Sequence, residues 1–411
     1  MKKIIVGQSG GPTAVINSSI AGVYKRAKEQ GIEKVYGMVH GIEGFLKEDI
    51  IDLDDYLKDD NNFELLKRTP SAFLGSCRYK LPKFEDAPEV YEKIFEILEK
   101  NEIDALFYTG GNDSMDTVKM LSDYAKLNNK PQLFMGVPKT IDNDLPITDH
   151  CPGYGSAVKY IATSIKEVIR DNASFGVVKP TVCIVEIMGR HAGWLTAGAA
   201  LAKGDDCEGV DAIYLPEVTF DLDKFVENVK DLASRKSSVV IAVSEGIMTS
   251  DGKFVCELGD DNKAVDAFGH KQLSGTASFL ASIIAKETGL KTRAIELSTL
   301  QRAATHLASL TDINDALESG AKAVDAVMEG KTAMMATIIR DSSNPYQTHC
   351  EVYDIHNIAN VEKKIPVEWI DTENNQMKDE YLEYARPLII GELTPIFKNG
   401  LPAHLVRKES K

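Results

Sequence analysis

The sequence lacks the long apolar runs of a membrane protein. No stretch approaches the roughly 18 uninterrupted apolar residues that mark a transmembrane helix. Near the start, only residues 4–6 form an apolar run before glycines and polar residues follow. Such a run is too short for the core of a signal peptide and is typical of a first β-strand. We therefore expect no membrane association and a cytoplasmic location.

Cysteine is scarce and scattered. The chain of 411 residues has six cysteines, with no C-x-x-C pair and no regular spacing. This pattern argues against a disulfide framework and indicates a reduced, intracellular protein. The cysteines are Cys77, Cys151, Cys183, Cys207, Cys256 and Cys350.

The sequence also lacks a basic stripe. Its 47 lysines and arginines are outnumbered by 62 aspartates and glutamates, which gives a net charge of −15. Such a surface repels nucleic acid and anionic membranes, so neither is an expected partner. An anionic substrate remains compatible with this charge only if the chain builds a locally positive pocket.

Short β-branched runs alternate with amphipathic stretches along most of the chain, whose length exceeds what one compact core supports. This alternation predicts an α/β fold with two Rossmann-like lobes and mainly parallel sheets, with the active site in the cleft between them. The expected strands are 3–6, 105–109, 133–137, 181–187, 239–243 and 333–340. The expected helices are 13–29, 115–127, 158–171 and 192–203.

We expect the lobes to be assembled from separate parts of the chain. Residues 1–150 and 302–345 form one lobe, and residues 151–301 form the other. Residues 346–411 are richer in charge and proline and less regular, and we expect them to form a C-terminal extension that packs on the lobes.

Two glycine-rich turns each follow a strand and open a helix: GQSGGPT at 7–13 and TGGNDS at 109–114. Paired glycines let backbone N–H groups approach phosphate oxygens, and the helix N-terminus adds a positive dipole. A tight structural connection explains either turn alone equally well. Neither turn matches the dinucleotide fingerprint G-x-G-x-x-G or the P-loop pattern.

The first turn also matches G-x-S-x-G, the nucleophile elbow of α/β-hydrolases, with Ser9 at its centre. Here the elbow follows the first strand, which leaves no earlier loop for a second oxyanion donor. Hydrolase chemistry also needs a later acid and a histidine, and nothing in the context of His191 or His306 selects them. A hydrolase is therefore the weaker alternative.

The segment 137–144, VPKTIDND, follows an apolar strand. If the chain stays extended, alternation places Asp142 and Asp144 on the same side. Two adjacent carboxylates suit a general base with a partner that tunes it or contacts a metal, while Lys139 and Thr140 can meet phosphate oxygens. A solvated acidic turn is an equally good interpretation of these residues taken alone.

Read together and in order, several segments resemble the phosphofructokinase family. The matching segments are GGPTAVIN, FLGSCR, TGGNDS, PKTIDND, VEIMGR, VSEG, TRA and LQR, which span roughly residues 4 to 340. The resemblance implies Mg²⁺-dependent phosphoryl transfer to the 1-hydroxyl of fructose 6-phosphate, a step of glycolysis. It also implies that residues 1–150 and 302–345 form a phosphoryl-donor lobe and that residues 151–301 form a sugar-phosphate lobe.

The resemblance also implies roles for individual residues. Asp142 is the expected base for the 1-hydroxyl, with Asp144 and Thr140 as its partners, and Arg190 stabilises the transferring group. Gly11, Arg78 and Gly111 belong to the donor site. The implied sugar-phosphate contacts are Thr140, Asp142, Met188, Gly189, Arg190, Glu245, Arg293, Thr299 and Arg302.

Two positions bear on the phosphoryl donor. ATP-using relatives carry glycine where Asp113 and Lys139 stand. A carboxylate at 113 would repel the α-phosphate of ATP, and Lys139 could bind released phosphate. These residues favour pyrophosphate, in a reversible reaction that yields fructose 1,6-bisphosphate and phosphate, over the alternative of an ATP-dependent 6-phosphofructokinase.

The sequence departs from the family pattern at Asn112, where an aspartate near Mg²⁺ is usual, although an amide oxygen can still contribute to a metal site. Thr299 stands where a histidine or tyrosine is common. A regulatory homologue that binds sugar phosphate without turnover is a third interpretation, which the retention of Asp142, Asp144 and Arg190 disfavours. We expect a homodimer or a homotetramer.

Overall fold

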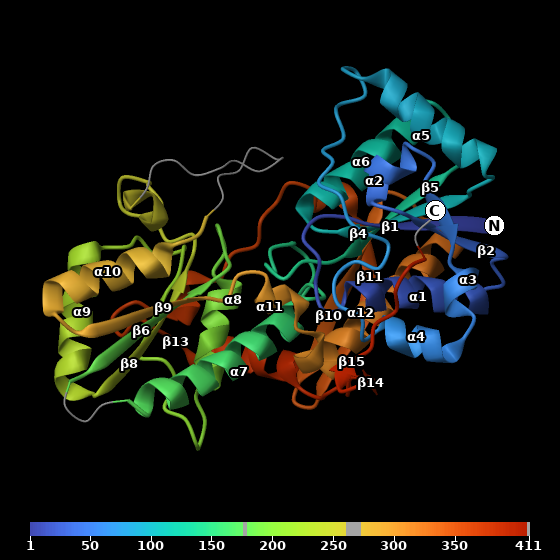
Figure 1. The fold of residues 1–411 in the computed structure, drawn as a ribbon. Helices are drawn as coiled ribbons and strands as arrows, with labels where there is room; N and C mark the ends of the chain where they lie inside the picture. Colours follow the sequence, from blue (N-terminus) through green and yellow to red (C-terminus); the bar gives the residue numbers. More distant parts are fainter. Residues whose placement is uncertain (176–178, 260–272, 409–411) are drawn as a thin grey trace. The chain divides into compact units, whose positions relative to one another are not determined.

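The computed structural model describes residues 1–175, 179–259 and 273–408 (Figure 1). The chain divides into two compact units. Unit 1 comprises Met1–Ser156, Arg302–Glu362 and Ile390–Lys411, and unit 2 comprises Ala157–Gln301 and Lys363–Ile389. The residues after 345 are thus shared between the units.

Unit 1 is built on a seven-stranded sheet in the order β11-β10-β5-β4-β1-β2-β3. The five central strands are parallel, and β3 and β11 pair antiparallel at the two edges. The strands are β1 (Lys3–Gln8), β2 (Lys34–Met38), β3 (Ile50–Asp52), β4 (Ala105–Gly110), β5 (Leu133–Pro138), β10 (Met334–Ser343) and β11 (Tyr346–Asp354). Strand β4 is buried along its whole length, as a central parallel strand covered on both faces must be.

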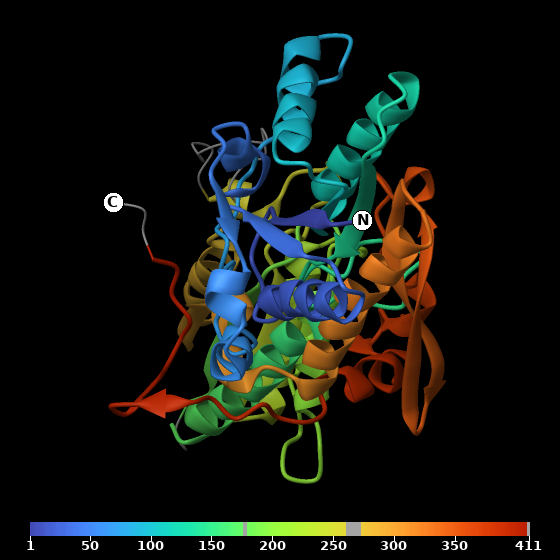
Figure 2. The same cartoon turned by 90° about the vertical axis from the view of Figure 1, so that its right-hand side faces the viewer.

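Helices cover both faces of this sheet (Figures 1 and 2). One apolar core joins the sheet to α2, α5 and α6, and a second joins it to α1, α3, α4 and α12. The helices are α1 (Ile16–Glu29), α2 (Gly41–Phe45), α3 (Asp54–Leu57), α4 (Asp60–Leu66), α5 (Pro88–Lys100), α6 (Asn112–Leu127) and α12 (Leu310–Met328). In α5, proline opens the helix and the buried Tyr91, Ile94, Phe95 and Leu98 recur at helical spacing.

Unit 2 contains a four-stranded, fully parallel sheet in the order β7-β8-β6-β9. Its strands are β6 (Thr181–Ile187), β7 (Ala212–Tyr214), β8 (Ser238–Ser244) and β9 (Lys291–Glu296). Helices α9 (Leu222–Arg235) and α10 (Thr276–Thr288) pack their apolar side chains, among them Phe225 and Leu280, onto the sheet.

The remaining elements are short, apart from helix α7. They are α7 (Tyr154–Ala173), α8 (Trp194–Ala197), α11 (Leu300–Ala303), α13 (Asp379–Ala385) and the two-residue strands β12 (Ile370–Asp371), β13 (Gln376–Met377), β14 (Phe397–Lys398) and β15 (Leu401–Pro402).

The mixed α/β class and the mainly parallel sheets confirm the fold expected from the sequence. Two local expectations were wrong. The predicted helix 192–203 is the single turn α8 followed by a 3₁₀ segment, Gly198–Ala202. The irregular tail expected after residue 345 opens instead with the nine-residue strand β11, whose polar side chains alternate because it is an edge strand with one solvated face.

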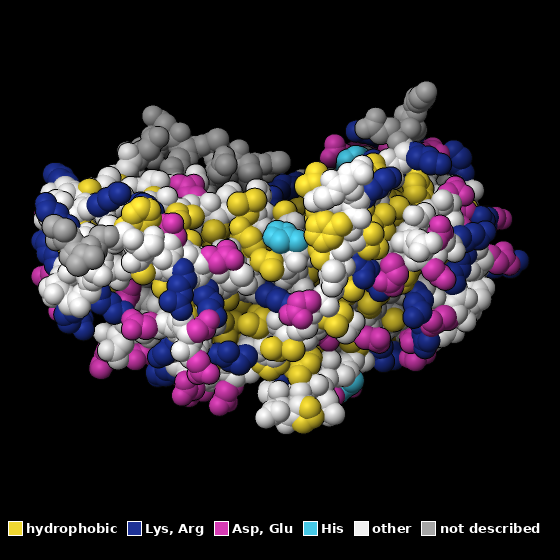
Figure 3. Space-filling view, turned by 60° about the horizontal axis from the view of Figure 1, so that its bottom comes forward, with side chains coloured by type: hydrophobic (Ala, Val, Ile, Leu, Met, Phe, Trp, Pro, Cys, Tyr) yellow, Lys and Arg dark blue, Asp and Glu magenta, His cyan; other side chains and the backbone are white. Residues whose placement is uncertain are grey.

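On the face shown in Figure 3, lysines and arginines are interspersed with aspartates and glutamates and do not gather in a stripe. Among the described residues, no helix is long and apolar enough to cross a membrane.

Candidate active site

Three loops that carry predicted site residues begin at one edge of the unit 1 sheet. The register pairs Gln8 with Thr109 and Gly110 with Pro138, so β1, β4 and β5 end at the same level. The carboxyl ends of neighbouring parallel strands are where ligands bind in folds of this class. The structure therefore brings together the two glycine-rich turns and the 139–144 segment.

The first glycine-rich turn is held by the loop 74–78. The backbone N–H of Gly10 donates to the carbonyl of Cys77 (3.0 Å), and Ser76 Oγ donates to the carbonyl of Gly10 (2.6 Å). Gly10 has a positive φ of 72°, which an L side chain rarely adopts. Arg78 follows directly and is exposed. The loop thus carries Arg78 to the side of this turn.

Lys139 is the buried cation of this region. Its side chain is 2% exposed, and Nζ donates to the carbonyls of Ser9 (2.7 Å) and Gly11 (2.6 Å). Burial lowers the pKa of Lys139 to about 8, against the opposing effect of Asp142. The positive charges of Arg302 and Arg78 lower it further. Lys139 and the two arginines that act on it thus bring positive charge to this region, as an anionic ligand requires.

Ser9 is not presented as a nucleophile. Its side chain is buried, and its hydroxyl shares a hydrogen bond with the hydroxyl of Ser114 at the start of α6. A Cβ at Gly110 would lie 1.8 Å from Ser114 Oγ and 2.7 Å from Ser9 Oγ. The serine pair thus links the two glycine-rich turns, which accounts for Ser9 without hydrolase chemistry.

The expectation that 140–144 is extended was wrong. Strand β5 ends at Pro138, and Asn143 adopts a left-handed conformation with φ of 56°. Thr140 Oγ1 accepts the N–H of Asp142 (3.1 Å) and donates to Asp142 Oδ2 (3.2 Å). Strand alternation fails here because asparagine tolerates the left-handed region and turns the chain. Asp142 is exposed, whereas Asp144 is half-buried.

Asp142 and Asp144 nevertheless interact. Burial and then the charge of Asp142 raise the pKa of Asp144 to about 7. Burial and the neighbouring charge thus favour the protonated form of Asp144, and a cation bound to this carboxyl would reverse that preference. Two interacting carboxyl groups, one more buried than the other, are typical of acid–base sites.

The second glycine-rich turn opens α6 without a capping side chain. Gly111 occupies the N-cap position, and Asn112 and Asp113 form the first turn. The N-terminus of such a helix favours an anion. Asp113 is exposed, so its carboxylate stands at this positive end and is open to solvent.

Two oxygens near this turn fit a magnesium ion. Asn112 Oδ1 and Asp144 Oδ1 are both buried, and neither has a hydrogen-bond partner within the described part of the chain. Asn112 also lowers the pKa of Asp144, against the larger effect of burial, which indicates that the two side chains lie close together. The described residues hold no cluster of three histidines, cysteines or acids. Mg²⁺ fits such an incomplete oxygen set because it keeps several waters and binds substrate phosphates.

Arg302 also belongs to this region of unit 1. A Cβ at Gly11 would lie 3.0 Å from Arg302 Nη1, so the guanidinium lies against the first glycine-rich turn. The family resemblance implies that Arg302 contacts the sugar 6-phosphate, and its position beside Gly11 also fits a contact with a donor phosphate.

The other predicted sugar-phosphate residues lie in unit 2, again where parallel strands end. The register pairs Ile187 with Ser244 and Glu186 with Glu296. The turns after β6 and β8 are packed together: a Cβ at Gly246 would lie 2.0 Å from the carbonyl oxygen of Arg190.

Glu245 and Met188–Arg190 therefore form one compact group. The N–H of Gly189 donates weakly to Glu245 Oε1 (3.4 Å), and Ser244 Oγ donates to the carbonyl of Gly189 (2.5 Å). Gly189 has a φ of 146°, and a Cβ there would lie 2.7 Å from the carbonyl oxygen of Ala192. Glycine at 189 is thus required by both conformation and space.

Arg293 and Thr299 lie on or after the edge strand β9. Arg293 Nη1 donates to Asp171 Oδ2 (3.0 Å), and its guanidinium stacks 4.4 Å from the ring of Phe175. Thr299 is exposed. Within unit 2 the charge of Arg293 is thus already partly neutralised by Asp171.

Sequence reasoning missed the buried polar residues that hold these loops. Glu186 Oε2 accepts the N–H of Ala277 at the start of α10 (2.8 Å), and Gln301 Oε1 accepts the N–H of Met188 (3.3 Å). Asn143 Oδ1 accepts the N–H of Cys151 (2.9 Å). The only sequence signal was a polar residue beside a buried strand or between two aspartates, which does not identify its partner.

Comparison with known proteins decides the family. The phosphofructokinase family model matches residues 3–327. The chain belongs to the phosphofructokinase family. It is 41% identical over 397 residues to the pyrophosphate–fructose 6-phosphate 1-phosphotransferase of Halomonas elongata. This match covers 96% of this chain and 93% of the relative. The enzyme of the same name from Methylococcus capsulatus is 39% identical over 400 residues, covering 97% and 94% of the two chains.

A solved family structure has the same fold over the whole chain. The pyrophosphate-dependent phosphofructokinase of Nitrosospira multiformis superposes with a TM-score of 0.88 at 37% identity, and the match covers 100% of this chain and 99% of that one.

Proposed function

We propose that the protein is a phosphotransferase that moves a phosphoryl group from pyrophosphate to the 1-hydroxyl of fructose 6-phosphate. The observation that carries this proposal is Lys139, buried beneath the first glycine-rich turn with its ammonium on the carbonyls of Ser9 and Gly11. A fixed cation there, with Asp113 at the second turn, suits a short inorganic donor. The names of the relatives support the same donor.

The unit 1 residues suffice for the acid–base step. Asp142 takes the proton of the 1-hydroxyl as that oxygen attacks the nearer phosphorus, and the bridging P–O bond breaks to release phosphate. Because phosphoryl transfer needs mainly positioning and charge neutralisation, Lys139, Arg78 and the helix N-terminus supply the larger part of catalysis. In unit 2, the group formed by Met188–Arg190 and Glu245 binds the sugar phosphate.

Asn112 and Asp144 would hold Mg²⁺, whose charge would offset that of the donor phosphates. All six cysteines are free thiols, which supports a reducing compartment such as the cytoplasm. We further propose a homodimer or homotetramer, as the family resemblance implies, and a place in glycolysis.

The test is a donor comparison. Purified protein with fructose 6-phosphate and Mg²⁺ is assayed with matched concentrations of pyrophosphate, ATP and ADP, and fructose 1,6-bisphosphate is measured. We expect turnover with pyrophosphate and little with ATP. The reverse reaction from fructose 1,6-bisphosphate and phosphate should also proceed. Efficient turnover with ATP and none with pyrophosphate would identify an ATP-dependent kinase.

Arg302 tests the placement of the sugar phosphate. We expect Arg302→Gln to raise KM for fructose 6-phosphate with little change in kcat, because a 6-phosphate contact is equally strong in the ground and transition states. The structure sets a clear alternative, since Arg302 lies against Gly11. A KM increase confined to pyrophosphate would assign Arg302 to the donor, and a fall in kcat alone would assign it to the transferring group.

A further inference from the structure

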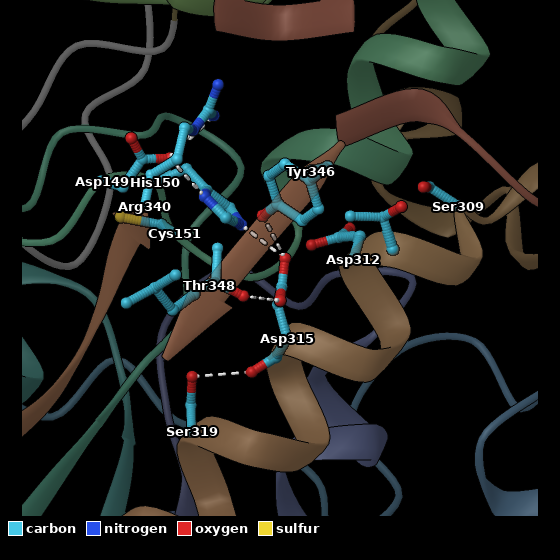
Figure 4. Close-up of polar contacts among 12 residues, drawn as sticks. Asp149, His150, Cys151, Ser309, Asp312, Asp315, Ser319, Arg340, Tyr346 and Thr348 are labelled. Carbon is cyan, nitrogen blue, oxygen red and sulfur yellow. Dashed lines mark hydrogen bonds and ion pairs between the residues drawn. The ribbon is translucent and has the colours of Figure 1, made fainter. Parts of the chain in front are cut away.

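A buried ionic network lies behind the 139–144 segment in unit 1. At its centre is His150, which is fully buried (Figure 4). Its Nδ1 lies 2.9 Å from Asp149 Oδ2, and its Nε2 lies 3.1 Å from Asp315 Oδ2 on α12. Arg340 on β10 donates to Asp149 through Nη2 (2.8 Å) and Nε (3.2 Å). None of these residues has a role in the proposed chemistry.

The geometry requires His150 to be an imidazolium. Both ring nitrogens face carboxylate oxygens, and a neutral ring has only one N–H, so it would turn a lone pair toward one of them. With His150 charged, the two cations His150 and Arg340 balance Asp149 and Asp315. The two carboxylates raise the pKa of His150 to about 9, against the opposing effect of burial.

The other groups facing this centre are on α12 and β11. Tyr346 Oη donates to Asp315 Oδ2 (2.8 Å), and Thr348 Oγ1 donates to Asp315 Oδ1 (3.2 Å). Figure 4 shows both side chains converging on Asp315. Asp312 lies one turn earlier on α12. Burial raises the pKa of Asp312, and the charge of His150 opposes this rise.

The network holds in place the residues that follow the 139–144 segment. Asp312 accepts the N–H groups of Gly153 (2.9 Å) and Ser156 (2.8 Å) through its two carboxylate oxygens. The residue after His150 is Cys151, whose N–H donates to Asn143 Oδ1 (2.9 Å). Asn143 is the left-handed residue between Asp142 and Asp144. One hydrogen bond thus links Cys151, the residue after His150, to the turn that orients the carboxylates of Asp142 and Asp144.

We propose that His150 is a positioning residue for phosphoryl transfer: as an imidazolium held between Asp149 and Asp315, it fixes the chain that places Asp142 and Asp144. Its effect on rate rests on the proposed function, whereas its effect on the conformation of 143–151 does not. His150 touches neither reacting group and acts through Cys151 and Asn143.

The first test is kinetic. His150→Gln removes the cation that faces Asp315, while Asp149 keeps Arg340. We expect kcat to fall by about 10- to 100-fold, as for residues that orient catalytic groups, while KM for both substrates stays within about twofold. The matched control is His349→Gln, an exposed histidine on β11 paired with Asp341, which should keep wild-type kcat. Adding Asp315→Asn to His150→Gln rebalances the charge and should restore part of kcat.

The second test does not depend on activity. Hydrogen exchange measured by mass spectrometry should be faster in residues 143–151 of His150→Gln than in wild type and unchanged in His349→Gln. The free energy of unfolding should also respond to pH. Because the folded-state pKa of about 9 exceeds the ordinary 6.5, the contribution of His150 is complete below 6.5 and is lost as pH rises through 9. The stability gap between wild type and His150→Gln should therefore narrow over that interval.

The outcomes separate the two proposals. Wild-type kcat in folded His150→Gln, or unchanged exchange in 143–151, overturns the positioning role. Absence of turnover by the wild-type protein with any donor overturns the proposed function, and the exchange measurement still decides the role of His150. If His150→Gln does not fold, Asp315→Asn is tested in its place. Slower turnover together with faster exchange in residues 143–151 supports the proposal. Wild-type turnover together with wild-type exchange overturns it.

Discussion

Replacing Asp142 with asparagine is expected to lower kcat by about 10²- to 10⁴-fold, the range typical of a positioned general base. Asparagine keeps the size of the side chain and an oxygen for the Thr140 hydroxyl, so the turn should survive. It removes the carboxylate that we propose as the base for the 1-hydroxyl. The neighbouring Asp144 is a poor substitute, because its burial favours its protonated form even when the charge of Asp142 is removed.

The measurement is steady-state kinetics with pyrophosphate and fructose 6-phosphate, with KM expected to change much less than kcat. Asp341→Asn serves as the matched control, because Asp341 is an exposed carboxylate of unit 1 whose partner is His349. A near-wild-type kcat in Asp142→Asn would remove Asp142 from the mechanism.

The second large effect is a change of donor. In Asp113→Gly combined with Lys139→Gly, we expect the ratio of kcat/KM for ATP to that for pyrophosphate to rise. A carboxylate about 4 Å from a phosphate anion costs about 4 kcal/mol at an effective dielectric of 20 and about 1 kcal/mol in water. Asp113 is exposed, so its repulsion of a phosphate of ATP lies near the lower value. An energy of that size corresponds to about a fivefold preference for pyrophosphate over ATP.

Lys139 contributes the larger part. A hydrogen bond to a charged group contributes about 1.5–3 kcal/mol, so its loss should weaken the use of pyrophosphate by about 10- to 100-fold. Because burial lowers the pKa of Lys139 to about 8, kcat/KM for pyrophosphate should also fall as pH rises through that value, and this alkaline limb should be missing in Lys139→Gly.

Both single variants and the double variant should be assayed with both donors over the same pH range. Lys139→Met is the control for folding, since it removes the charge but keeps most of the buried volume beneath the first glycine-rich turn. A donor ratio that is unchanged in the double variant would show that these two positions do not select the donor.

Much of this protein follows from its sequence by itself. Buried β-branched strands alternating with amphipathic helices determine the α/β class, because each periodicity matches only one kind of element. The glycine-rich turns and the order of the motifs identify the family. Given the acidic composition, binding of an anionic substrate is predicted to need a local cluster of cations.

The tertiary structure alone decided how these parts meet. The sequence does not show that Lys139 reaches back across the sheet edge to the carbonyls of Ser9 and Gly11, nor that Ser9 is bound to Ser114. It also misplaced Asp142 and Asp144 on an extended strand, because the left-handed Asn143 is fixed by the N–H of Cys151, eight residues away. Hydrogen bonds of this kind depend on distances between segments far apart in the chain, and no local propensity or spacing records those distances.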